Sequence, residues 1–243
     1  MEKQIGFRRN IYLSWLDATA AMCSETSDAQ ELRARLDPIV AEQVQSDENR
    51  QYALLILINI WVSTRNQYPI LRDDAVQLYA NTVTARDRLW LHYGLTLLAY
   101  PFFRTGMAAI GQLTCHGDAI TTRGVERQLA KTLGQIGGLK NATERLIFSL
   151  RNWGVLIDTT QRYAYGTRIL PASSHTIELW MLEVALAAHP AQDLPFADLI
   201  RLPELFPFRF TLSVDDLRRT ERFEIQRQGI GWDMVRLAEF VRH

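Results

Sequence analysis

The sequence predicts a mainly α-helical fold that includes short segments of paired strands. Apolar residues recur at helical spacing through most of the first 112 residues. The stretch NATERLIFSLRNWGVLIDTTQRYAYGTRI, from Asn141 to Ile169, combines an amphipathic helix with β-prone runs around a polar turn. A third part has one strongly apolar helix followed by proline-punctuated turns and alternating apolar residues. We therefore expect three segments, at residues 1–112, 113–170 and 171–243.

The first segment is expected to be an all-helical domain, an N-terminal helical bundle. Its apolar stripes predict helices over residues 10–23, 28–44, 49–67 and 87–104. Pro38 is a point of interruption in the second helix, and the last must end or bend before Pro101. His92 and Tyr93 lie among apolar residues, so we assign them to the core and not to catalysis. Helix-on-helix packing is the natural way to bury these stripes.

Two helices with a glycine-rich break between them open the second segment. The first starts near Thr121 or Thr122, and GQIGG at residues 134–138 ends it. Asn141 and Glu144 match a capping box, which predicts that the second helix begins at Asn141. Its apolar stripe consists of Ala142, Leu146, Leu150 and Trp153. We expect the indole of Trp153 to pack in the core where the helix meets the following strands.

A short hairpin is predicted directly after this helix. Gly154 is the expected helix stop, and Val155–Ile157 and Tyr163–Ile169 are β-prone runs on either side of a polar tip. Helix, glycine-rich turn, helix and hairpin is the order of a winged helix-turn-helix. In that fold the second helix enters the DNA major groove, and the hairpin, or wing, contacts the neighbouring backbone. Winged helices also dock other proteins, and Phe148 on the polar helix face suits that alternative better than DNA recognition.

The third segment is expected to contain one helix and several short strands. Residues 174–190 form a strongly apolar helix, and Phe206–Leu212 alternate as in a half-buried strand. Ser213–Asp216 start a further helix, and Phe223–Leu237 suit a strand, a glycine turn and a last strand. One interpretation of this order is a second wing-bearing unit.

Positive charge is concentrated in the second segment, although the whole chain has a net charge of zero. Residues 115–175 hold eight basic and four acidic residues, whereas residues 176–216 hold two and seven. A neutral protein with one basic module can bind phosphates through that module. Only three of the 27 basic residues are lysines. This arginine bias suits phosphate and guanine contacts, or it reflects a GC-rich genome without functional meaning.

Several classes of protein do not fit the sequence. The longest apolar run, Tyr52–Val62, is too short to span a bilayer, and the N-terminus lacks the apolar core of a signal peptide. Two distant cysteines fit a reduced, cytoplasmic protein, so we expect cytoplasmic localisation and no membrane partner. Cys115, His116 and Asp118 lie close in sequence, but a polar loop explains them better than a metal site.

No motif for an enzyme or a cofactor is present in the sequence. The run GQIGG lacks the lysine and hydroxyl residue of a nucleotide-binding loop, and no G-x-G-x-x-G follows a strand. No acidic pair with a nearby lysine suggests a nuclease. We expect a protein without catalytic activity, cofactor or metal.

The stretches ARDRLWLHYGLTLLAYPFFR and ATERLIFSLRNWGVL carry a resemblance. Over residues 80–170 the chain resembles the BrxA family of bacterial BREX anti-phage systems, and more broadly the winged-helix proteins of defence islands. This resemblance implies a non-enzymatic protein that binds double-stranded DNA and acts with other defence-system proteins. The DNA contacts that it implies are Thr122, Arg123, Lys140, Asn141, Arg145, Arg151 and Arg162.

Overall fold

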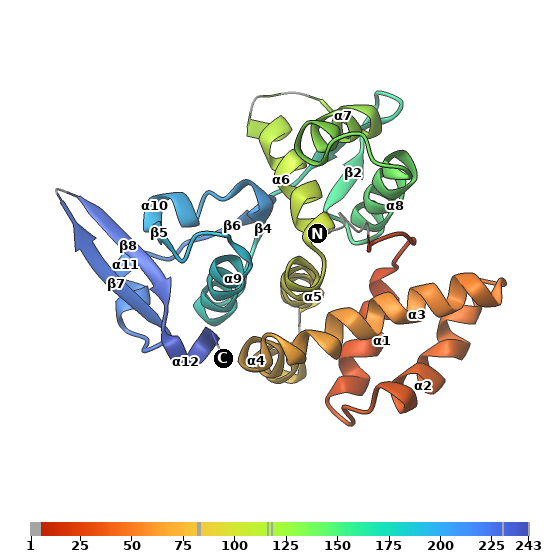
Figure 1. The fold of residues 1–243 in the computed structure, drawn as a ribbon, viewed down its shortest axis with the longest axis horizontal. Helices are drawn as coiled ribbons and strands as arrows, with labels where there is room; N and C mark the ends of the chain where they lie inside the picture. The colour runs from red at the N-terminus through yellow and green to blue at the C-terminus, as the bar shows by residue number, and fades with distance from the viewer. Residues whose placement is uncertain (1–5, 82–83, 116, 118, 230, 243) are drawn as a thin grey trace.

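The computed structural model describes residues 6–81, 84–115, 117, 119–229 and 231–242. It is mainly helical with three small sheets, which confirms the expected mainly α class (Figure 1). Within these residues, every helix is too short or too polar to cross a membrane.

The N-terminal part consists of helices that pack on one another, and α5 is the last of them. Their bounds are α1 Leu13–Cys23, α2 Ala29–Ala41, α3 Asp47–Trp61, the 3-10 turn η1 Ser63–Asn66, α4 Pro69–Asn81 and α5 Ala85–Ala99. α2 continues through Pro38 without interruption. The helix α4 was not anticipated, because its sequence mixes apolar and charged residues without a clear stripe.

The helix α5 lies near the centre of the molecule and packs against α3, α4, α6 and α9 (Figure 1). Its residues from Leu89 to Leu98 are all buried. His92 and Tyr93 are fully buried, which confirms their assignment to the core. The Tyr93 hydroxyl donates hydrogen bonds to the carbonyl oxygens of Glu204 and Phe206, so α5 is tied to the C-terminal part of the chain.

The middle unit, residues 101–167, contains three helices and one antiparallel sheet. Its elements are α6 Pro101–Cys115, β1 Ile120–Thr121, α7 Thr122–Leu133, α8 Leu139–Asn152, β2 Leu156–Asp158 and β3 Ala164–Thr167. The strand order is β1-β3-β2, with Ile120 opposite Tyr165 and Ile157 opposite Gly166. The predicted break after α7 and stop after α8 are confirmed, since Gly134 and Gly154 have φ of 81° and 75°. α6 runs across the boundary expected at residues 112 and 113.

The C-terminal unit, residues 170–242, has a parallel strand pair and a second three-stranded antiparallel sheet. Its elements are β4 Leu170–Pro171, α9 His175–Ala188, β5 Asp193–Pro195, α10 Phe196–Leu199, the 3-10 turn η2 Pro203–Leu205, β6 Phe208–Arg209, α11 Val214–Arg218, β7 Phe223–Gln228, β8 Trp232–Leu237 and α12 Glu239–Arg242. The expected helix start at Ser213 is confirmed by a capping box with Asp216. The second sheet has the order β5-β8-β7, which repeats the connectivity of the sheet in the middle unit.

The strand expected over Phe206–Leu212 is reduced to the two residues of β6. The aromatic side chains of this stretch contact α5 instead of lining a sheet face. Phe208 lies 4.5 Å from the ring of Trp90 and 4.7 Å from that of Tyr93, measured between centroids. Their alternation therefore reflects packing on a helix, which a period-two pattern does not distinguish from a strand.

Candidate nucleic-acid interface

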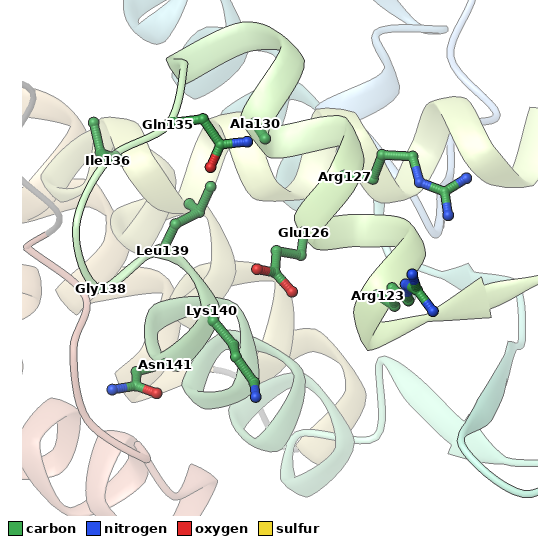
Figure 2. Close-up of a pocket in the computed structure, with 10 residues that line it drawn as sticks. All are labelled: Arg123, Glu126, Arg127, Ala130, Gln135, Ile136, Gly138, Leu139, Lys140 and Asn141. Atoms are coloured by element: carbon green, nitrogen blue, oxygen red, sulfur yellow. The ribbon is translucent and has the colours of Figure 1, made fainter.

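An open groove of about 510 Å³ separates α7 from the start of α8 (Figure 2). Figure 2 shows Arg123 and Arg127 on α7, Lys140 and Asn141 on the first turn of α8, and Glu126 between the two helices. The groove floor is apolar, formed by Ala130, Ile136 and Leu139.

The helix α7 presents its basic side chains to solvent because its apolar stripe is narrow. Thr121 is the N-cap, and its hydroxyl accepts a hydrogen bond of 3.0 Å from the backbone N–H of Gly124. Val125 and Leu129 face the core and are fully buried. Arg123 and Arg127 lie one helical turn apart on the exposed side of α7. Thr122 is the first helical residue and is half-buried.

The N-cap of α8 lies three residues earlier than the capping box predicted. Leu139 is its first residue and Gly138, with φ of 81°, is its N-cap, so the assignment of Asn141 as the N-cap was wrong. Glycine adopts this left-handed conformation without strain, so the chain can turn directly into the helix. Among the described residues no side chain caps α8. The Leu139 N–H donates to the Ile136 carbonyl oxygen at 3.3 Å and the Ala142 N–H to that of Gly138 at 3.0 Å, which leaves the N–H groups of Lys140 and Asn141 at the helix start. Such an N-terminus favours anions.

The electrostatics of the groove are dominated by positive charge. It is lined by three basic side chains and a single acidic one, Glu126. Among the residues that the structure describes, no carboxylate forms an ion pair with Arg123, Arg127 or Lys140. These three charges are therefore available to an anionic partner.

The opposite flank of α8 is covered by an extended N-terminal segment. We call residues 6–12 the N-terminal strap. Ile11 N–H donates to Ser149 Oγ at 3.0 Å, and the Trp153 indole N–H donates to the Ile11 carbonyl at 2.9 Å. Arg145 lies on this flank, away from the groove, with its Nη1 3.3 Å from Asn10 Oδ1.

Two further residues implied by the resemblance, Arg151 and Arg162, lie at the hairpin of β2 and β3. Arg151 is exposed and pairs with Asp158 at 2.7 Å, and this hydrogen bond raises the pKa of its guanidinium. Arg162 is at the hairpin tip, with its guanidinium 4.7 Å from the ring centroid of Tyr163. Tyr163 has a positive φ of 62°, so the tip turns sharply, and the side chain of Tyr163 is exposed.

The structure thus brings Arg123, Lys140 and Asn141 together at one groove, whereas Thr122 is not among the residues that line it. It places Arg145 on the strap flank, Arg151 beside the hairpin and Arg162 at the hairpin tip. Arg127 belongs to the groove but was not among the sequence candidates. Its spacing of four residues from Arg123, outside the apolar stripe of α7, was a signal that could have identified it.

The possible metal-ligating residues near Cys115 do not form a site that can be described. His116 and Asp118 lie outside the described residues, and Cys115 is exposed at the end of α6. Elsewhere in the described ranges, no cluster of three metal-ligating side chains occurs.

Comparisons with protein-family models, with curated proteins and with solved structures find no match to this chain. The interface is therefore argued from its own geometry and charge.

Proposed function

We propose that the middle unit is a winged helix-turn-helix that binds duplex DNA, without catalysis. In this proposal α8 enters the major groove, and the hairpin of β2 and β3 contacts the neighbouring backbone. The observation that carries it is the basic groove at the start of α8, which Arg123, Arg127 and Lys140 line. Both the charges and the N–H groups of Lys140 and Asn141 suit a DNA phosphate.

The order of elements supports the same proposal. A helix, a short strand, two helices and a hairpin follow one another, and the short strand β1 pairs with β3. The exposed face of α8 carries Asn141 and Glu144 between its two flanks. Asparagine can bond adenine, and glutamate can accept from the amino group of cytosine, so this face can contact base edges.

Docking of another protein is the second candidate. Phe148, whose place on the polar face of α8 favours protein docking in the sequence, is half-buried. It packs edge-on against Tyr12 at 5.3 Å between ring centroids. Apolar exposure instead lies around the hairpin, where Ile157, Tyr163 and Ile169 are 42%, 66% and 64% exposed. Such a surface suits a protein partner. The resemblance to BrxA implies that the protein acts with other defence-system proteins, and these would be the partners in the docking candidate.

A titration of the protein into a random-sequence duplex at several salt concentrations tests the proposal. If phosphate contacts dominate, log affinity falls linearly with log salt, with a slope of about −0.9 for each neutralised phosphate. Fluorescence anisotropy measures both affinity and slope. Absence of binding at low salt, or binding insensitive to salt, would favour the docking candidate.

Removing charge from α7 is expected to weaken DNA binding without unfolding the protein. The double variant Arg123→Ala with Arg127→Ala removes two exposed charges, so the salt slope is expected to lose about 1.8 in magnitude. The melting temperature should hold, since exposed substitutions usually change stability by about 0.5 kcal/mol or less. Arg201→Ala is the matched control, because Arg201 is exposed in the C-terminal unit, just after α10, and does not line the groove. A double variant with the parent's slope would exclude α7 from the interface.

A further inference from the structure

The N-terminal strap is built into the surface of α8. Phe7 is fully buried among aromatic rings, with its centroid 5.6 Å from Phe103 and 6.4 Å from Trp153. Farther along the strap, Ile11 is also fully buried. Directly after the strap, the N–H of Leu13, the first residue of α1, donates to Asn152 Oδ1 at 2.7 Å. Contacts along two turns of α8 therefore hold the strap in a fixed position.

Two basic residues lie between the buried anchoring residues of the strap. Between the buried Phe7 and Ile11, Arg8 is exposed and Arg9 is half-buried. The Arg9 guanidinium lies 4.7 Å from the ring centroid of Tyr52 on α3, and its Nη1 donates to the Arg8 carbonyl at 3.0 Å. These contacts restrict Arg9 to the strap surface, between the strap and α3.

The strap and α7 lie on opposite flanks of α8. Lys140, on the groove side, and Arg145, on the strap side, are five residues apart, which is roughly 140° around the helix. Lys140 lines the groove with α7, whereas Arg145 contacts Asn10 of the strap. The exposed face of α8 therefore has positive charge on both sides.

A helix in a major groove has a sugar–phosphate backbone along each flank. An α-helix about 10–12 Å across fits a groove about 12 Å wide, so the elements beside the helix meet both strands. The groove of α7 and α8 supplies contacts to one strand. The second strand then faces the strap.

We propose that Arg8 and Arg9 of the N-terminal strap bind the second DNA strand, so that the protein clamps both phosphate backbones around α8. This inference rests on the proposed DNA binding of the middle unit. It adds to the interface a segment more than 130 residues away in sequence, as the bond from Ile11 to Ser149 shows.

The test compares the parent with the double variant Arg8→Ala and Arg9→Ala in the full chain, using anisotropy titrations on a random-sequence duplex. The salt slope is expected to lose about 1.8 in magnitude, the value for two phosphates. The variant Arg8→Lys with Arg9→Lys keeps both charges and should recover the parent's slope. If the strap only positions α8, both double variants should show the same dependence of log affinity on log salt as the parent, and the clamp would be wrong. The single variant Arg8→Ala avoids the contact with Tyr52 and should lose about half as much slope.

The outcomes separate this inference from the proposed function. A parent that does not bind duplex DNA overturns both. If Arg123→Ala with Arg127→Ala lowers the slope and the strap variants do not, the proposed function stands and the clamp is wrong. Loss of slope in both pairs, with Arg201→Ala and the melting temperatures unchanged, supports the clamp.

Discussion

Replacing Trp153 by alanine is expected to destabilise the protein by about 3–5 kcal/mol, the usual cost of removing a buried tryptophan. The side chain is only 3% exposed and lies 5.7 Å from the ring of Phe103. Its indole N–H also donates to the Ile11 carbonyl, so the variant loses packing and one buried hydrogen bond together. Urea denaturation of parent and variant measures the difference.

A tryptophan in a different environment provides the control for this change. Trp232 at the start of β8 is 57% exposed, so Trp232→Ala should change stability by about 0.5 kcal/mol or less. If Trp153→Ala left the unfolding midpoint unchanged and abolished DNA binding, Trp153 would be a contact residue. The assignment of its indole to the core would then be wrong.

Removing Arg222 is expected to have an effect of similar size, because it leaves a buried carboxylate without its partner. The Arg222 guanidinium donates to both carboxylate oxygens of Glu183, at 2.8 and 2.6 Å, and also bonds Asp74 on α4. The Glu183 side chain is 3% exposed. Breaking a buried pair by removing one partner costs about 3–5 kcal/mol. As a control, Arg236→Ala on β8 breaks an exposed pair with Glu224 on β7 and should cost about 1 kcal/mol or less.

This cluster also predicts a pH dependence. Burial raises the pKa of Glu183 from 4.5 to about 7, against the opposing effect of Arg222. A carboxyl whose pKa is raised on folding contributes stability below its unfolded pKa, and this contribution is lost as pH rises through about 7. Without Arg222, the protonated form of the Glu183 carboxyl is favoured more strongly. The free energy of unfolding of the Arg222→Ala variant should therefore be closest to that of the parent near pH 5 and differ most from it above pH 7. A destabilisation equal at pH 5 and pH 8 would contradict this account. Glu183→Gln should remove this dependence.

Local signals in the sequence were sufficient where a structural feature depends on neighbouring residues. Gly134 and Gly154 ended the helices as expected, and Ser213 with Asp216 formed the predicted capping box. The capping pattern at Asn141 failed because Gly138 offered an earlier start, and a capping motif alone does not rank two possible starts. The element order of the middle unit was therefore predictable, but its helix boundaries were less so.

The candidate interface was predictable on its groove side only. Arg123 and Lys140 follow the charge pattern of α7 and α8, and both line the groove. The flank at Arg145 depends on the strap, whose partners on α8 are more than 130 residues away, as the contact between Arg145 and Asn10 shows. The strap has too few residues for a periodic pattern, so the sequence did not indicate that it packs on α8. Neither did it indicate that Arg222 pairs with Asp74 across 148 positions.

The position of the strap has a consequence for how the chain folds as it is synthesised. The strap is synthesised long before its partners on α8, since Ile11 and Ser149 are 138 positions apart. At a synthesis rate of about 5–20 residues per second, the strap waits on the order of ten seconds before α8 exists. During that time the apolar side chains of Phe7 and Ile11 have no native contact with α8. The strap therefore docks after α8 has formed, so an early stage of biogenesis exposes the apolar segment that later completes the aromatic core.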